Sequence, residues 1–282
     1  MTIHRNNLCS VIMASVLMTA TSYAGAPLND LQGSGGLGYN PLAYLAGRYV
    51  ASETNSIADW VSIPQGGLWY VNFCDENIHW LAASGAFSIA KRLELSYGYG
   101  LIGNVKGDED INTHNLGLKL KFIDENAWDT TWLPAIAVGG KWKHTSTEML
   151  KGLGVRQQGM DAYLVATKMI TQTPLPVLVS AGVMLSDEIV CGVLGHNDYG
   201  LAGFGSVSVL PLQCLAVGVE YKGGVDAGSG IQNSDYWNAH AAWFATERLT
   251  LVAAYGYTGR MEGGLDDIGI GQAIVLSVQY GF

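Results

Sequence analysis

Lysines recur at every second position in several segments of this 282-residue chain. Lys119 and Lys121 share one face with leucines on the other, and Lys141 and Lys143 repeat this arrangement. We assign Lys168 and two acidic residues to the same side of the expected strands as these lysines. The candidates for lining a pore are therefore Lys119, Lys121, Lys141, Lys143, Lys168, Glu94 and Glu220. A strip of lysines along an aqueous pore favours anions. The alternative is a narrow interior in which these charges pair internally or are hydrated without conduction.

A histidine and a serine two residues apart have the residue types for nucleophilic chemistry. In a strand, His144 and Ser146 project from the same side, so the imidazole could take the proton of the hydroxyl. That side is shared with Trp142 and lies opposite the lysines. No third residue that would orient the histidine is evident. Polar residues at a strand end are the ordinary explanation, so we assign no catalytic residue.

Acidic residues gather in segments expected to be loops, where carboxylates could hold divalent cations. They are Asp108, Glu109, Asp110, Asp187, Glu188, Glu262, Asp266 and Asp267. Their spacing does not match an EF-hand loop, so solvated loops are the simpler interpretation. Beyond residue 24, Cys74, Cys191 and Cys214 lack the spacing of a metal site, and which two of them could form a disulfide stays open. We therefore expect no metal and no cofactor.

Strands are the elements that must position these residues. Large apolar residues alternate with small or polar ones along most of the chain, which is typical of strands with two different faces. This pattern predicts about twelve strands, near residues 43–50, 78–89, 93–101, 113–122, 134–144, 160–170, 177–185, 199–209, 214–222, 236–245, 249–258 and 271–282. Residues 67–73 belong either to a further strand or to a loop. Only 14% of residues are charged, with 37 glycines and 14 tyrosines, which also favours strands over helices.

Long and short connections alternate between these strands. Long connections rich in Gly, Asp and Asn are expected near residues 102–112, 145–159, 186–198, 223–235 and 259–270, and tight turns near residues 90–92, 171–176, 211–213 and 246–248. Residues 124–133 are longer than a turn needs. Short periplasmic turns and longer extracellular loops are typical of outer-membrane β-barrels, whereas a soluble sandwich has no reason to alternate so regularly.

The N-terminal residues predict export. Arg5 precedes a short apolar stretch, and Ser22 and Ala24 place small residues where a signal peptidase cleaves. The apolar stretch is too short to cross a bilayer as a helix. We therefore divide the chain into a signal peptide (residues 1–24), a glycine-rich leader or plug (residues 25–42) and a transmembrane β-barrel (residues 43–282). The net charge of −9 argues against nucleic-acid partners.

Aromatic residues fall near both ends of the expected strands, as in the belts that mark membrane interfaces. The interface candidates are Tyr97, Tyr99, Trp142, Tyr221, Tyr255, Tyr257, Tyr280 and Phe282, and we assign Tyr163, Tyr199, Tyr236 and Phe244 to the same two belts. Hydrocarbon offers no partner to an open sheet edge, so the sheet must close. The sequence thus predicts an all-β fold, a closed antiparallel transmembrane β-barrel of about twelve strands.

Two stretches carry a resemblance to known families. The ending VQYGF (residues 278–282) resembles the terminal aromatic signature of Gram-negative outer-membrane β-barrels, which implies that barrel assembly machinery reads Phe282. The stretch LQGSGGLGYNPLAYLAG (residues 31–47) looks like the start of an uncharacterised outer-membrane barrel family, one of those named as domains of unknown function. His144 and Ser146 resemble the arrangement in outer-membrane phospholipases, but Thr147 and Glu148 replace the Asn-Gly that follows the serine in that family.

Taken together, these features predict a protein of the Gram-negative outer membrane that contacts membrane lipid and lipopolysaccharide. The function we expect is a passive pore or a transport-related role for small solutes. A non-conducting structural or surface-exposed barrel is the alternative, followed by a barrel-embedded lipid hydrolase. Residues 26–39 either enter the lumen as a plug or form a mobile leader, and the solute and the oligomeric state stay open.

Overall fold

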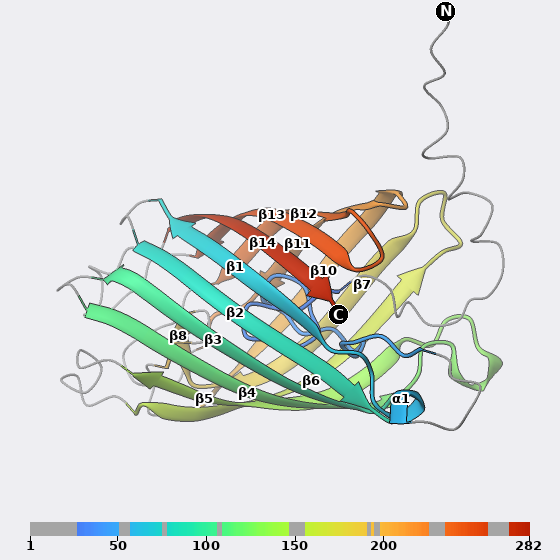
Figure 1. The fold of residues 1–282 in the computed structure, drawn as a ribbon, viewed down its shortest axis with the longest axis horizontal. Helices are drawn as coiled ribbons and strands as arrows, with labels where there is room; N and C mark the ends of the chain where they lie inside the picture. Colours follow the sequence, from blue (N-terminus) through green and yellow to red (C-terminus); the bar gives the residue numbers. More distant parts are fainter. Residues whose placement is uncertain are drawn as a thin grey trace, which may run out of the picture.

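A computed structural model of the chain shows an antiparallel barrel closed by hydrogen bonding between its first and last strands (Figure 1). The structure describes residues 27–50, 57–74, 78–105, 109–146, 156–190, 193–194, 198–225, 235–258 and 271–282. The expected signal peptide, residues 1–24, lies outside the described residues. The predicted all-β barrel fold is confirmed.

Within the described residues the barrel has twelve strands, and each pairs with its neighbours along the chain. They are β1 (Gln65–Phe73), β2 (Ile78–Ile89), β3 (Leu93–Val105), β4 (Glu109–Ile123), β5 (Ala135–Ser146), β6 (Gln158–Ile170), β7 (Val177–Ser186), β10 (Gly200–Leu212), β11 (Leu215–Lys222), β12 (Tyr236–Phe244), β13 (Leu249–Thr258) and β14 (Gln272–Gly281). Two short strands, β8 (Glu188–Val190) and β9 (Val193–Leu194), form a separate hairpin between β7 and β10.

Helical structure is minor in the described part of the chain. It consists of α1 (Ile57–Trp60) and a single 3₁₀ turn, η1 (Ala127–Asp129). None of the helices among the described residues is long and apolar enough to cross a bilayer.

Large apolar side chains cover the outside of the barrel, and small or polar side chains point inward. In β4, Leu116, Leu118 and Leu120 are 55%, 51% and 45% exposed, whereas Lys119 between them is 1% exposed. A water-soluble fold would have the opposite distribution. The outer surface is therefore suited to lipid, as in other transmembrane barrels.

The barrel begins later in the chain than the alternating pattern predicts. β1 pairs with β14 from Gln65 opposite Gly281 to Phe73 opposite Ala273, which closes the sheet. The expected first strand at residues 43–50 is wrong, because that stretch makes only an isolated bridge between Arg48 and Ile63. Ala43, Tyr44 and Ala46 of this stretch pack inside the barrel instead of facing lipid.

Residues 27–50, which we call the inner segment, run through the interior of the barrel as an irregular chain (Figure 1, blue). Pro27 lies near Gly281 at the end of β14. The segment then extends to Tyr39, which contacts Glu188 beyond the far end of β7, and returns to Gly47 beside Gln65 at the start of β1. Both ends of the inner segment therefore lie at the barrel end that also holds the C-terminus.

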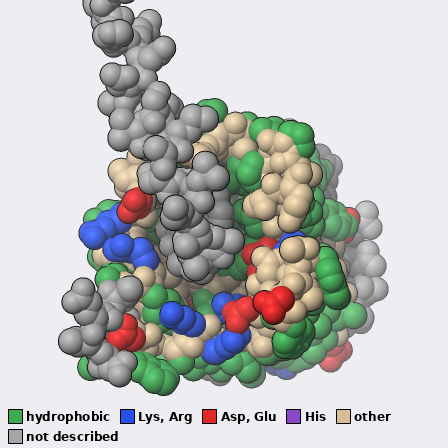
Figure 2. Space-filling model, turned by 90° about the vertical axis from the view of Figure 1, so that its right-hand side faces the viewer, with side chains coloured by type: hydrophobic (Ala, Val, Ile, Leu, Met, Phe, Trp, Pro, Cys, Tyr) green, Lys and Arg blue, Asp and Glu red, His purple; other side chains and the backbone are tan. Residues whose placement is uncertain are grey.

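That end of the barrel carries the tight turns. The connections between β2 and β3, β6 and β7, β10 and β11, and β12 and β13 are short there, and η1 lies in the longer connection from β4 to β5. At the opposite end, the long connection expected at residues 102–112 is shorter than predicted, since β3 and β4 extend into it. Figure 2 looks onto the tight-turn end and shows charged side chains at its rim with hydrophobic side chains around the flanks.

Replacing Leu276 by Arg tests the assignment of the outer surface to lipid. Leu276 lies midway along β14 and is 52% exposed, so an arginine there would enter the centre of the apolar layer. For the barrel folded in lipid vesicles, we expect the free energy of unfolding to fall by about 2–4 kcal/mol. Gln272→Arg, at the strand end, should lower it by only about 0–1 kcal/mol. Equal costs for the two variants in urea titrations would contradict a membrane-embedded β14.

Candidate functional site

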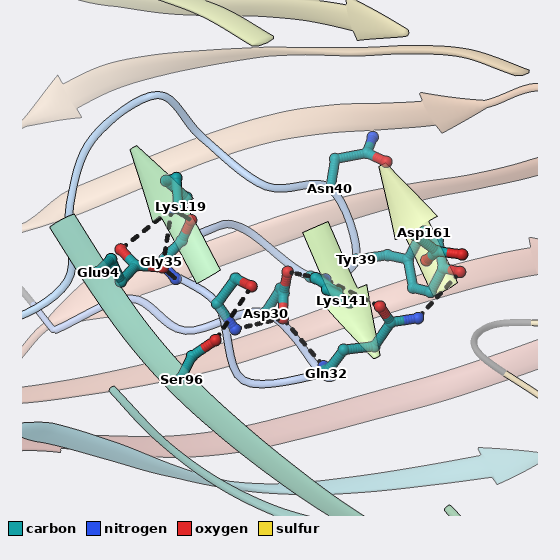
Figure 3. A network of polar contacts seen from close by, with 12 residues as sticks. Asp30, Gln32, Gly35, Tyr39, Asn40, Glu94, Ser96, Lys119, Lys141 and Asp161 are labelled. Atoms are coloured by element: carbon teal, nitrogen blue, oxygen red, sulfur yellow. Dashed lines mark hydrogen bonds and ion pairs between the residues drawn. The ribbon is translucent and has the colours of Figure 1, made fainter. Parts of the chain in front are cut away.

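A buried ion pair on neighbouring strands holds the inner segment from one side. Glu94 of β3 and Lys119 of β4 are direct cross-strand partners, with Nζ and Oε1 3.0 Å apart and both side chains 1% exposed. Glu94 accepts the backbone N–H groups of Gly35 (2.9 Å) and Ala46 (2.6 Å). Lys119 donates to the carbonyl oxygens of Gly35 (2.8 Å) and Tyr44 (3.1 Å). The two charges thus bind two separate stretches of the inner segment. Figure 3 shows the contacts of the pair with Gly35.

A second ion pair joins the inner segment to β5. The Lys141 ammonium lies 2.8 Å from the Asp30 carboxylate and donates to the side-chain oxygen of Gln32, also at 2.8 Å. Asp30 in turn accepts the backbone N–H groups of Gln32 (3.0 Å) and Ser34 (2.9 Å). The carboxylate therefore stabilises a local turn of the segment while it anchors that turn to the wall (Figure 3).

On β11, a single carboxylate binds three consecutive backbone amides. Glu220 accepts the N–H groups of Gly38 (3.1 Å), Tyr39 (3.1 Å) and Asn40 (2.6 Å), and the Asn238 side chain adds a fourth donor at 2.5 Å. Successive N–H groups of this kind form a concave anion-binding arrangement, a nest. Here the bound anion belongs to the barrel wall and the nest belongs to the inner segment.

Close approach to these carboxylates explains glycine at two positions. A Cβ atom at Gly35 would lie 2.8 Å from Glu94 Oε2, and one at Gly38 would lie 2.8 Å from Glu220 Oε2. Neither distance is compatible with the hydrogen bonds just described. The glycine-rich composition of this stretch thus lets the backbone itself contact the wall.

Near the opposite end of the barrel, several charges converge on one residue between β7 and β10. Glu188 forms ion pairs with Lys143 of β5 (2.5 Å) and Lys222 of β11, and it accepts the Tyr39 hydroxyl. Lys143 also pairs with Asp161 of β6. All four ionic side chains are at most 3% exposed. The connection after β7 is therefore bound to the tip of the inner segment.

Asp187, the neighbour of Glu188, lies outside the barrel strands and is also buried. Burial raises its pKa to about 6; the Lys143 ammonium opposes this rise and the Asp161 carboxylate adds to it. Arg156 lies 3.6 Å away. Asp187 therefore exchanges its proton close to neutral pH, unlike an ordinary exposed aspartate.

Amide side chains bind the inner segment where it enters and leaves the lumen. Gln279 of β14 accepts the Asn29 N–H (2.6 Å) and donates to the Asn29 carbonyl oxygen (3.2 Å). Gln65 of β1 donates to the Leu28 carbonyl oxygen (3.0 Å) and accepts the Gly47 N–H (2.9 Å). The first and last strands of the barrel thus fix both limbs of the segment.

Two of the predicted pore-lining lysines lie elsewhere. Lys121 pairs with Asp124 (2.8 Å) in the connection after β4. Lys168 shares the outward parity of Leu164 in β6 and pairs with Glu125 (3.2 Å), so its assignment to the inward face is wrong. Both lysines attach to the connection between β4 and β5 at the tight-turn end. The other candidates, Lys119, Lys141, Lys143, Glu94 and Glu220, point inward and bind other groups of the protein.

Their partners were not among the predicted pore-lining residues, and the expectation that Asp187 and Glu188 lie in a solvated loop is wrong, since both are buried. Asp30, Asp161, Glu188, Gln65 and Gln279 complete the network. Asp161 could have been found from the sequence, since it lies at every-second-residue spacing with Tyr163 and Val165, which face the interior of β6. The contacts of Asp30 and Glu188 join segments far apart in the chain, so no local pattern indicates them.

The interface aromatics lie on the outside of the barrel. Tyr97, Tyr99, Trp142, Tyr221, Tyr255, Tyr257, Tyr280 and Phe282 are all 36–62% exposed. Tyr97 and Tyr221 also bond to polar neighbours, His114 at 2.7 Å and Asp235 at 2.6 Å. Three residues assigned to the same belts lie inside instead: Tyr163 is 3% exposed, and Tyr236 and Phe244 line interior cavities.

His144 and Ser146 lie on the outer face, as their parity predicts. The His144 ring stacks on Trp142, with centroids 6.1 Å apart and planes at 8°, and its other aromatic neighbour is His114 at 6.1 Å. The contacts of the described residues give His144 no carboxylate that would orient it toward Ser146.

Cys74 and Cys214 are free thiols, and Cys191 lies outside the described residues. Among the described residues, no cluster of His, Cys, Asp and Glu could hold a metal ion.

Two cavities that lie between the inner segment and the wall differ in size and position. The larger measures about 100 Å³ and extends toward the tight-turn end, where Leu178, Leu210 and Phe244 line it. The smaller measures about 40 Å³ and lies toward the other end, beside Phe73 and Trp80. The inner segment therefore fills the lumen incompletely.

A family model matches most of the chain. The family model described as "Protein of unknown function (DUF3034)" matches residues 25–274. The chain belongs to this family. The resemblance to an uncharacterised outer-membrane barrel family is thereby confirmed, and no curated protein matches the chain.

Solved structures with the same fold are outer-membrane barrels. The KdgM porin in complex with disordered oligogalacturonate has a TM-score of 0.52 and 13% identity, covering 77% of this chain and 99% of that chain. The KdgM porin alone gives a TM-score of 0.52 and 12% identity with the same coverage. The COG4313 outer membrane channel from Pseudomonas putida F1 gives 0.45 and 12%, covering 84% and 98%. At these identities the similarity shows the fold of the DUF3034 chain and not its solute.

Removing one member of the Glu94–Lys119 pair tests how strongly the inner segment is held. Lys119→Met leaves the Glu94 carboxylate buried without its cation, so we expect the free energy of unfolding to fall by about 3–5 kcal/mol. Lys121→Met, whose partner Asp124 is 45% exposed, should cost less than about 1 kcal/mol. Urea titration of the refolded barrel measures both.

The double variant Glu94→Gln/Lys119→Met separates the pair from its packing. Because it removes both charges, it should recover part of the stability that Lys119→Met loses. A double variant less stable than Lys119→Met, or equal costs at Lys119 and Lys121, would contradict a buried ionic clamp.

Proposed function

We propose that the protein is a gated pore or transport-related barrel of the Gram-negative outer membrane, in which the inner segment is the gate. The observation that carries this proposal is the attachment of the inner segment. The charges of the wall bind its backbone and side chains through hydrogen bonds and ion pairs, not through a covalent link. Such contacts can exchange for contacts with water when the segment moves.

The fold and the cavities support this function. Solved barrels of the same fold include proteins described as porins. The cavities beside the inner segment supply space into which it can shift. In the closed arrangement the inward lysines are occupied by carboxylates, so we expect anion conduction only after the segment has moved.

Single-channel recording in planar bilayers tests the gate. Glu220→Gln weakens the carboxylate that binds three consecutive amides, so we expect it to open at least threefold more often than the wild type. Glu247→Gln, at an exposed position in the tight turn between β12 and β13, is the matched control and should open as rarely as the wild type. In the open steps, Lys141→Glu should reduce the preference for anions.

The recordings also separate this function from its alternative. The paired lumen charges favour a non-conducting structural barrel if the segment never moves. Absence of conductance steps in both the wild type and Glu220→Gln, at any voltage, would favour that alternative over the pore. A lipid hydrolase finds no support in the surroundings of His144.

We further propose that barrel assembly machinery recognises Phe282 and that the outer wall contacts lipid and lipopolysaccharide. Phe282 is 62% exposed, lies edge-on to Tyr280 with ring centroids 5.5 Å apart, and donates its N–H to the Pro64 carbonyl oxygen. Its ring is thus accessible at the end of β14, and it contributes little buried surface to the fold.

Phe282→Ala should therefore impair assembly more than stability. We expect several-fold less heat-modifiable barrel in outer-membrane fractions, while the purified variant refolds with a stability within about 1 kcal/mol of the wild type. Phe282→Tyr keeps the aromatic ring and serves as the control. Normal assembly of Phe282→Ala in cells would contradict recognition through this residue.

A further inference from the structure

The lumen is divided into a charged side and an apolar side. The ion pairs and carboxylates that bind the inner segment come from β3–β6, from β11 and from the connection after β7. Both cavities lie mainly against the remaining wall and the inner segment, and the larger one also touches apolar side chains at Met169 of β6 and Ala216 of β11. None of the described residues that line either cavity is Lys, Arg, Asp or Glu.

The cavity linings are mostly aliphatic and aromatic. Residues of the larger cavity include Leu28, Leu42, Met169, Leu178, Leu210 and Phe244. Residues of the smaller cavity include Val71, Phe73, Trp80, Tyr236, Ala273 and Val275. The interior of an outer-membrane barrel is ordinarily polar, so an apolar lining on one side is a departure that calls for a physical reason.

The two cavities share part of their walls. Gly38, Trp69, His240 and Val252 line both. His240 is held in place by Ser208 (3.1 Å) and by the Asn238 side chain (2.9 Å). The apolar space therefore continues along the lumen on either side of a shared constriction.

Empty apolar space lowers stability, because its lining atoms lose dispersion contacts that a close-packed interior would provide. Water gains little there, since it needs two to four polar partners. A cavity of roughly 150 Å³ lined by Leu, Ile and Phe binds benzene in another protein, and the larger cavity here has a comparable lining and a volume of about 100 Å³. An uncharged ring restores the missing contacts, whereas an anion would have to give up its hydration without a free cation to receive it.

We propose that the apolar side of the lumen is a binding site for a small uncharged aromatic molecule. The ring occupies the larger cavity, and the constriction at Trp69 and Val252 leads to the smaller one. Trp69 adds a polar feature: its indole N–H is buried and has no hydrogen-bond partner among the described residues, so it is a donor available to a substituent on the ring. This site adds an uncharged class of ligand to the proposed pore, separate from the anions expected to pass the charged side of the lumen, and it rests on that function for its physiological role.

Binding of fluorobenzene, followed by ¹⁹F NMR with the refolded barrel in detergent micelles, tests the site. Ala242 lines the larger cavity, and Ala241 beside it in β12 points outward to lipid. Ala242→Phe should weaken binding at least tenfold, because the new ring occupies the ligand's space. Ala241→Phe adds the same ring to the outer surface and should leave binding within twofold of the wild type. 4-Fluorobenzoate, the charged analogue, should bind at least tenfold more weakly than fluorobenzene.

A second pair of variants covers the case in which Ala242→Phe does not fold. Ala216 lines the larger cavity and Val217 beside it faces outward in β11, so Ala216→Phe should weaken fluorobenzene binding at least tenfold and Val217→Phe should not. The site would be overturned if Ala242→Phe and Ala241→Phe bound fluorobenzene equally well. It would also be overturned if the wild type bound 4-fluorobenzoate as tightly as fluorobenzene. Because this measurement needs no open channel, its failure leaves the conductance result intact, and absence of conductance with specific fluorobenzene binding would overturn only the pore.

Discussion

In hydrocarbon, a backbone N–H or C=O finds no water, and each one left unpaired costs several kcal/mol. A sheet in a membrane therefore cannot keep an edge, and β1 must pair with β14 although they are the first and last strands of the described chain. Closure determines the rest of the architecture. The outer face is apolar and suited to lipid, aromatic rings lie on the outside of the barrel, and the buried ion pairs of the wall face the lumen.

The lumen of a twelve-stranded barrel is then a small space in which charges must find partners. Burial of an ion pair is tolerated only where the remaining donors and acceptors are also bound. The inner segment supplies these groups through its backbone. Glu220 accepts hydrogen bonds from three consecutive backbone N–H groups, and Lys119 donates hydrogen bonds to two backbone carbonyl oxygens. Glycine at positions 35 and 38 follows from the same requirement, since a side chain there would displace the carboxylates from the backbone.

Sequence alone predicts the features of this fold that are local. Alternation with a period of two identifies eleven of the barrel strands within a few residues of their observed positions, and it places Lys119 and Lys141 inside and Leu118 outside. It misplaces the first strand because an apolar side chain that faces an apolar lumen looks the same as one that faces lipid. Tyr163 and Lys168 are misassigned for a related reason: residue type suggested a membrane interface or a lumen, whereas parity along β6 decides the face. The pairing of Asp30 with Lys141 depends on where the inner segment folds back, which no local pattern specifies.

The division of the lumen into two sides makes the inner segment easier to move in one direction than in another. Displacement away from β3–β6 separates charges that are fully buried, so it is favourable only if water or mobile ions reach them at the same time. Among the described residues, sliding along β12–β14 and β1 breaks few polar contacts apart from those of Gln65 and Gln279, because most of that wall is apolar. The inner segment can thus slide along the apolar wall with little loss of polar contacts, whereas the ion pairs of the charged wall hold it in place. A solute that occupies the apolar cavities would act on the segment from the side on which it is held least.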